Sequence, residues 1–200
     1  MIRASGSHYD VGCQIGAAAG ASLRAIHEHV LATYAGRWPE LLAQSRAFMG
    51  ATRLHLPHVV DELRGAAEGS GVPFDDLFLM SIEELLNEEV RGEPTESEAP
   101  PGSANRERPK GCSDLAAGPP ATANGHVWAA HNNDLGPEAE EHLFVTRVQA
   151  DGEPEIMSVT VGGIFISIGF NSAGISLTGD QLYANDSRVG VPRLLIVRDI

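Results

Sequence analysis

The segment from residue 91 to residue 110 divides this chain into two parts of different character. It reads RGEPTESEAPPGSANRERPK and has hardly an apolar side chain. Because such a segment cannot offset its ordering entropy by burial, we expect an exposed, mobile processing linker over residues 91–111. Exposed segments of this kind are where proteolytic cleavage occurs. The sequence therefore predicts two parts, residues 1–90 and residues 112–200, separated by a segment that is open to cutting.

The first part is expected to be mainly helical. Apolar side chains recur there at helical spacing, and proline or glycine stands near the expected ends. The first helix, capped by Asp10, carries Gly12, Gly16 and Gly20 at every fourth position. Glycine costs helix propensity, so this spacing predicts close packing against another element. The four expected helices cover residues 10–35, 39–49, 57–69 or 57–71, and 74–90.

The second part has the pattern of β-strands. Short runs of β-branched and apolar residues are separated by Asn-Gly, Asp-Gly and Gly-Gly turns. Runs that are apolar on both faces predict a covered sheet in a layered arrangement of helices and strands. Residues 192–200 have the pattern of a helix start. The expected strands cover residues 127–130, 143–148, 156–161, 164–168 and 174–178.

The charge balance excludes one class of partner. Acidic residues outnumber basic residues 27 to 14, and the formal net charge of −13 repels phosphate backbones, so we expect no nucleic-acid partner. No apolar run approaches the span of a bilayer, and residues 1–6 lack the apolar core of a secretion signal. We therefore expect a cytoplasmic protein that makes no membrane contact.

Candidate metal ligands are few. The two cysteines are too few for a thiolate zinc site, and a disulfide between them is not expected without a secretion signal. His55 and His58, three residues apart on a helix, form a conceivable metal site with Asp61 or Glu62. Scattered histidines are more often surface residues, and motif matches of this kind are often false. We therefore predict no metal and no cofactor.

Cys112 is the candidate nucleophile. It follows Gly111 at the point where the expected linker meets the second part. Because glycine leaves its carbonyl unhindered, the Cys112 thiol can attack it and form a thioester that water opens. The new chain then begins at Cys112, and its α-amine, with a reference pKa of about 7.7–8.0, is a general base for the thiol. The pattern predicts self-cleavage between these two residues, and a small structural side chain is the alternative for a lone cysteine.

Polar residues follow the next expected strand. The Asn-Gly pair at residues 124–125 predicts a hairpin turn, and the strand after it ends in the residues HNND. These side chains are placed near a nucleophile on the neighbouring strand, where a carboxylate can hold the new ammonium group. We therefore take Asp134 as a catalytic candidate. The candidates for its support are His131, Asn132 and Asn133, and a simple turn is the alternative interpretation.

Several short segments occur in the order found in one known family. They are GSHYDVGCQIG at residues 6–16, the Gly-Cys pair at 111–112, Asn-x-Asp at 132–134, IGFNSAGISL at 168–177 and Gly-Val-Pro at 190–192. In this order they resemble the isopenicillin-N acyltransferase-like family of autoproteolytic acyltransferases, which are N-terminal-nucleophile hydrolases. No single motif is specific, and the resemblance rests on their order across nearly the whole chain.

The resemblance implies an α+β fold. An αββα sandwich is built by the residues after Cys112, and the helical first part becomes the small subunit when one precursor is cut into two. It implies Cys112 as the nucleophile, Gly111 as the residue whose carbonyl is attacked, and Asp134 as the aspartate near the new amino terminus. The implied substrate is a small-molecule amide or acyl donor, and acyl-CoA is a co-substrate if the transfer is of the penicillin type.

Members of this family are longer, and their later strands supply an oxyanion-hole asparagine and an arginine. Because this chain stops at Ile200, the resemblance implies an amino-terminal fragment with an incomplete sandwich and an incomplete site. The expected function is acyl transfer or amide hydrolysis through a thioester on Cys112. The alternative is a non-catalytic helical binding or assembly module, with residues 1–90 as its working part and Cys112 as a structural residue.

Overall fold

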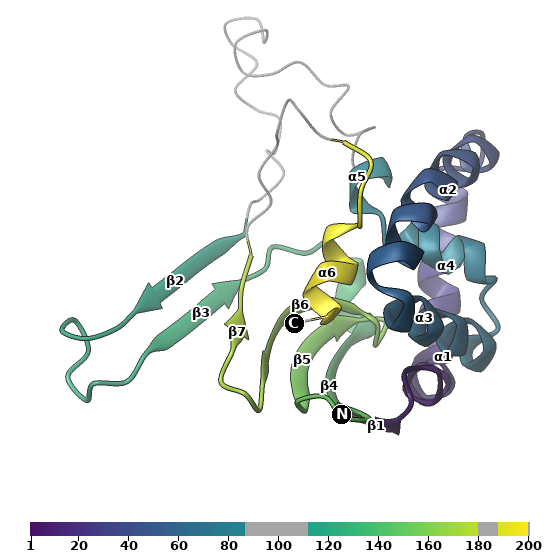
Figure 1. Cartoon of the computed structure of the whole chain (residues 1–200). Coiled ribbons are helices and arrows are strands. Elements are labelled where there is room, and N and C mark those ends of the chain that lie inside the picture. Colours follow the sequence, from purple (N-terminus) through teal and green to yellow (C-terminus); the bar gives the residue numbers. More distant parts are fainter. Residues whose placement is uncertain (87–111, 180–187, 200) are drawn as a thin grey trace, which may run out of the picture.

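The computed structural model describes residues 1–86, 112–179 and 188–199. The predicted linker, including Gly111, lies outside the described residues, and so does the end of the fourth expected helix. The described part combines helices beside a five-stranded sheet with a two-stranded hairpin that extends away from them (Figure 1). The predicted α+β class with a mainly helical first part is confirmed.

The helices differ from the predicted ones in three places. The second helix, expected over residues 39–49, runs from Trp38 to His55, because the single Gly50 does not end it and it stops only before the Leu56-Pro57 step. Ser7, not Asp10, caps the first helix, because Ser7 Oγ accepts a hydrogen bond from the Asp10 backbone N–H at 3.2 Å. The helix expected over residues 74–90 is interrupted at Ser81, whose hydroxyl donates to the Phe78 carbonyl and so competes with the helical hydrogen bonds. None of the helices in the described residues is long and apolar enough to cross a bilayer. The helices are α1 His8–Thr33, α2 Trp38–His55, α3 Pro57–Ser70, α4 Phe74–Met80, α5 Glu83–Leu86 and α6 Arg193–Asp199, with a 3₁₀-helix η2 at Pro137–His142.

The main sheet includes a strand that was not predicted. Its strand order is β1-β4-β5-β6-β7, with β1 parallel to β4 and the other neighbours antiparallel. Strand β1 lies at the start of the chain, so the first residues of the helical part belong to the sheet of the second part. The strands of this sheet are β1 Ile2–Gly6, β4 Leu143–Ala150, β5 Ile156–Val161, β6 Phe165–Asn171 and β7 Ser176–Leu177.

Helices α1 and α3 are in direct backbone contact. A methyl group added at Gly12 of α1 would lie 1.9 Å from the carbonyl oxygen of Glu62 in α3. One added at Gly65 of α3 would lie 2.1 Å from the carbonyl oxygen of Tyr9 in α1. No side chain fits at these separations, so the close packing predicted for the glycine-bearing helix is confirmed.

Two strands form a separate hairpin, β2 Ser113–Ala117 and β3 Trp128–Asn132. Its strands are exposed over most of their length, and Leu115 and Trp128 expose 62% and 59% of their surface. The cover predicted for these strands is therefore not found among the described residues. An αββα sandwich has two stacked sheets between its helices, and the described residues supply one five-stranded sheet with its helices. The αββα layering therefore stays an expectation.

Glu62 of α3 and Arg198 of α6 form a buried ion pair. The Arg198 guanidinium donates two hydrogen bonds to the Glu62 carboxylate, at 2.6 and 2.5 Å, and the residues are only 6% and 7% exposed. A ring nitrogen of His8 lies 3.3 Å from the same carboxylate. Burial alone would raise the pKa of Glu62, but the Arg198 charge and the hydrogen bonds from His8 and Arg198 outweigh it and lower the pKa. The hydrogen bond to Glu62 is also the main cause of a raised pKa at His8.

Replacing Arg198 by methionine should cost about 3–5 kcal/mol of unfolding free energy near neutral pH, because the buried Glu62 carboxylate loses its partner. The folded-state pKa of Glu62 is depressed, so its contribution is present above the unfolded value of 4.5 and is lost as pH falls through the folded value. The cost of Arg198→Met should therefore shrink below pH 4.5.

Urea unfolding of the wild type and of Arg198→Met, at neutral pH and again below pH 4.5, measures how the cost of the substitution changes with pH. The matched control is Arg64→Met, which removes an exposed ion pair with Asp61 and should cost less than about 1 kcal/mol. An Arg198→Met cost that is equally large at both pH values would contradict the lowered pKa of Glu62.

Candidate active site

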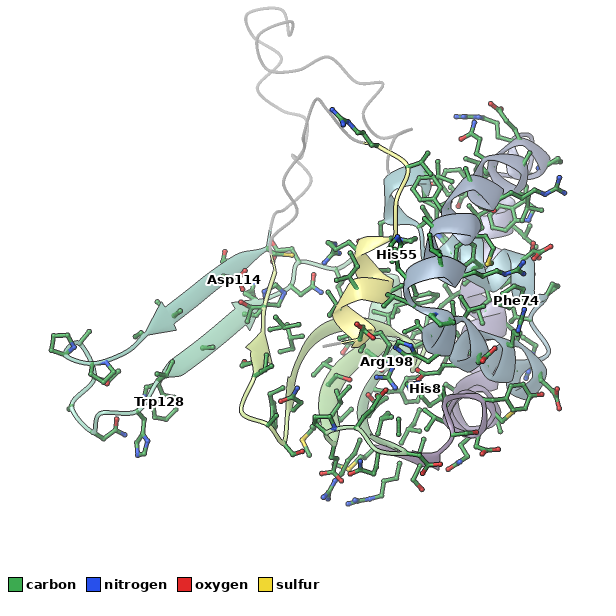
Figure 2. All side chains as sticks on the ribbon, viewed as in Figure 1. His8, His55, Phe74, Asp114, Trp128 and Arg198 are labelled. Atoms are coloured by element: carbon green, nitrogen blue, oxygen red, sulfur yellow. The ribbon has the colours of Figure 1, made fainter. Side chains whose placement is uncertain are left out.

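Cys112 stands directly before β2, at the end of the hairpin marked by Asp114 in Figure 2. Ser113 pairs with Asn132 across the hairpin, so residues 112 and 133 come next in the two strands. The Cys112 thiol donates a hydrogen bond to Asn133 Oδ1 over a sulfur–oxygen distance of 3.2 Å, and the cysteine is partly buried. The fold therefore brings together the predicted nucleophile and one predicted support residue.

A histidine–aspartate pair lies one step further along the same hairpin. Asp114 and His131 are cross-strand partners, with 2.7 Å between Asp114 Oδ1 and His131 Nδ1. The imidazole is enclosed, with 2% of its side chain exposed against 27% for the carboxylate. A carboxylate at Nδ1 orients the ring and leaves Nε2 to accept a proton. This pair lies two residues along the hairpin from the contact between Cys112 and Asn133.

The sequence named His131 only as a support residue and did not name Asp114. The signal that identifies Asp114 is the pairing register of β2 and β3. That register could not be read from the Asn-Gly pair at residues 124–125, because the two strands are joined by a longer loop over residues 118–127.

Asp134 is hydrogen-bonded to Asn132, two residues before it. Its Oδ1 accepts a hydrogen bond from Asn132 Nδ2 at 2.7 Å, and both residues are exposed. Among the residues that the structure describes, no hydrogen bond joins Asp134 to Cys112. Gly111 lies outside the described residues, and so does the predicted cleavage site between Gly111 and Cys112. The roles of Asp134 and Gly111 stay predictions.

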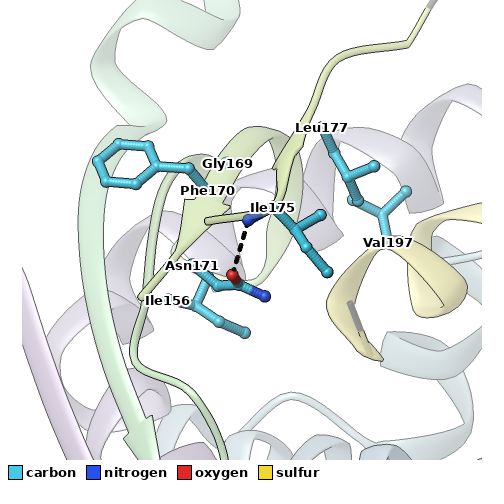
Figure 3. Close-up of a pocket in the computed structure, with 7 residues that line it drawn as sticks. All are labelled: Ile156, Gly169, Phe170, Asn171, Ile175, Leu177 and Val197. Carbon is cyan, nitrogen blue, oxygen red and sulfur yellow. Dashed lines mark hydrogen bonds between the residues drawn. The ribbon is translucent and has the colours of Figure 1, made fainter. Parts of the chain in front are cut away.

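A small apolar pocket lies between the end of the sheet and α6 (Figure 3). Asn171 is 7% exposed, and its side-chain carbonyl accepts hydrogen bonds from the backbone N–H groups of Ala173 and Ile175. This asparagine therefore holds the turn between β6 and β7, within the segment 168–177 that carries part of the family resemblance. The pocket is lined by Ile156, Gly169, Phe170, Asn171, Ile175, Leu177 and Val197, and none of the described site candidates is among them.

Fold and hairpin together define an α+β protein that carries a thiol–amide contact and a histidine–aspartate pair near one end of the same hairpin. No protein-family model matches the chain. In an alignment 109 residues long that covers 51% of this chain, the chain is 28% identical to the beta-alanyl-dopamine/carcinine hydrolase of Drosophila melanogaster. The match covers 28% of that protein, so the chain spans less than a third of this relative. The chain is thus distantly similar to a hydrolase over half of its length.

Proposed function

We propose that this chain carries the nucleophile of an amide hydrolase or acyltransferase, and that Cys112 becomes its amino-terminal residue by self-cleavage. The similarity to a hydrolase named for beta-alanyl-dopamine and carcinine supports the amide chemistry. The observation that carries the proposal is the contact between the Cys112 thiol and Asn133. The thiol is hydrogen-bonded to a polar side chain at the end of the hairpin. A structural cysteine, in contrast, is typically a small hydrophobic residue in an apolar core.

Self-cleavage begins when the Cys112 sulfur attacks the carbonyl carbon of Gly111. The C–S bond forms, the C–N bond breaks, and the Cys112 nitrogen takes up the proton, which leaves residues up to 111 attached as a thioester. Water then adds to the thioester carbonyl, so that Gly111 leaves with a free carboxylate and Cys112 regains its thiol. One precursor thereby gives a small subunit that ends at Gly111 and a large one that begins at Cys112.

In the processed chain the α-amine of Cys112 takes the proton of its own thiol. The thiolate attacks the carbonyl carbon of a small-molecule amide, and the leaving amine carries the proton away. The acyl group remains on sulfur as a thioester and passes to water or to an acceptor amine. Hydrolysis and acyl transfer share the formation of this acyl thioester on Cys112. If acyl-CoA is the donor, it binds as a co-substrate that is itself a thioester, and no further cofactor is proposed.

The surrounding side chains are assigned supporting roles. Asn133 accepts the thiol hydrogen bond and so orients the Cys112 sulfur. Asp134, held by Asn132, is proposed to stabilise the ammonium form of the new amino terminus. His131, oriented by Asp114 on the same hairpin, is proposed as a second proton acceptor for the thiol.

Iodoacetamide near neutral pH should label Cys112 at least about tenfold faster than Cys13, because in the proposed processed chain the α-amine of Cys112 takes the proton of its own thiol. Timed labelling followed by peptide mass analysis measures both rates in one sample. Cys13 is the internal control, since it is also partly buried but lies within α1. Equal inertness of the two thiols would contradict the proposal and would favour the helical binding module with a structural Cys112.

A further inference from the structure

Side chains from three distant segments meet beside the buried pair of Glu62 and Arg198. His8 begins α1, His58 lies in the first turn of α3, and Glu153 lies in the turn between β4 and β5. One imidazole nitrogen or carboxylate oxygen from each lies within 4.8 Å of the other two, and all three residues are partly exposed. In Figure 2 the labels of His8 and Arg198 mark this place between the helices and the sheet.

Hydrogen bonds orient both imidazole rings. His8 Nδ1 lies 3.3 Å from a Glu62 oxygen, and His8 Nε2 lies 2.8 Å from Glu153 Oε1. The ring of His58 is 4.7 Å from that of His8 between centroids, and its Nε2 lies 2.5 Å from Asp199 Oδ1. A metal-binding histidine almost always donates its other ring N–H to a carboxylate or carbonyl. Glu62 supplies that partner at Nδ1 of His8, which leaves Nε2 for an ion.

The charge around the two rings favours a divalent cation. Glu62, Glu153 and Asp199 bring three negative charges, and Arg198 brings one positive charge, so the cluster carries a formal charge of −2 when both imidazoles are neutral. Side chains at the rim are only partly covered, with 38% of the Glu153 side chain exposed. An ion therefore has a path to the cluster, and water can complete its coordination.

We propose that His8, His58 and Glu153 bind a divalent transition-metal ion, with Zn²⁺ as the best match. Two imidazoles and one carboxylate are a donor set that zinc uses, with bonds of about 2.0–2.2 Å and a water as the fourth ligand. Tetrahedral bonds of that length put ligand atoms about 3.4 Å apart. The three atoms, now within 4.8 Å of one another, would move by no more than about 1.4 Å, which rotation of partly exposed side chains supplies, and the ion would replace the hydrogen bond between His8 and Glu153.

The sequence predicted no metal, and this site also differs from the histidine pair that was weighed there. His58 lies with His8 and Glu153 rather than with His55, and Glu62 acts as an outer partner of His8. None of the three ligands belongs to the hairpin that carries Cys112, so the metal proposal does not depend on the proposed function. A bound ion would join the start of α1 and the start of α3 to the β4–β5 turn.

Calorimetric titration of the metal-free wild-type chain with ZnCl₂ should show one saturable site, and saturation should raise the unfolding temperature. Glu153→Gln and His58→Gln each remove a ligand and should each weaken binding at least about tenfold. The control His29→Gln changes an exposed histidine of α1 and should leave the affinity unchanged.

No saturable zinc binding by the wild-type chain would overturn the proposal. Unchanged affinity in both ligand variants would overturn it too, because the ion would then be bound by other histidines. Circular dichroism checks that each variant is folded. If His58→Gln unfolds, the turn variant Glu153→Gln decides alone, and a Co²⁺ titration adds a second readout, since the visible absorption of the wild-type complex should be lost in that variant.

Discussion

Replacing Cys112 by alanine should abolish amide turnover and should leave the bond after Gly111 uncut. Without the thiol, neither the cleavage thioester nor the acyl thioester can form, and removing a nucleophile typically costs at least about a thousandfold in rate. Release of amine from an amide substrate measures turnover, and chain length on a denaturing gel measures cleavage. Cys112→Ser keeps a weaker nucleophile and should still cut slowly.

The control is Cys13→Ala, because Cys13 lies in α1 and is the other free cysteine of the chain. Both cleavage and turnover should be unchanged in this variant. Turnover at the wild-type rate in Cys112→Ala would exclude Cys112 as the nucleophile and leave it a structural role at the hairpin end.

Replacing Gly65 by alanine should destabilise the fold by at least about 3 kcal/mol, at the upper end of the cost of overpacking a core. The added methyl group would lie 2.1 Å from the carbonyl oxygen of Tyr9, so α1 and α3 would have to move apart. The methyl carbon is fixed to the backbone of α3, and the carbonyl oxygen belongs to the backbone of α1. No side-chain rotation therefore relieves the clash. Urea unfolding followed by circular dichroism measures the loss.

The matched control is Gly50→Ala in α2, where an added methyl group meets nothing within 4 Å. Helix propensity alone favours alanine there by about 1 kcal/mol, so this variant should gain stability. The two substitutions are chemically the same and should change the free energy of unfolding in opposite directions. A gain in stability for Gly65→Ala would show that α1 and α3 are not in backbone contact.

Local signals predicted much of the fold. The strand over residues 156–161 was predicted with its observed ends, and Gly71, with a φ of 76°, ends α3 as expected from a glycine at that place. Strand β1 was missed because residues 2–6 are short and small, and because their partner β4 lies in the other part of the chain. Parallel pairing between segments so far apart leaves no local signal.

The candidate site was predicted less completely than the fold. Cys112 stood out by its place after Gly111, and Asn133 was named from the polar strand end that follows β3. Which polar residue meets the thiol depends on the pairing of the two strands, and this selects Asn133 rather than Asp134. The cluster around His8 could not be predicted, because its three ligands are far apart in the sequence.

The central claim is that Cys112 becomes an amino-terminal nucleophile. Mass analysis of the folded wild-type protein, before and after a brief exposure to an amide substrate, tests it most directly. We expect a fragment that begins at Cys112, and on that residue an acyl group that hydroxylamine removes, as it does from a thioester. An intact folded chain with no fragment beginning at Cys112, or an acyl group carried by another residue, would contradict the account.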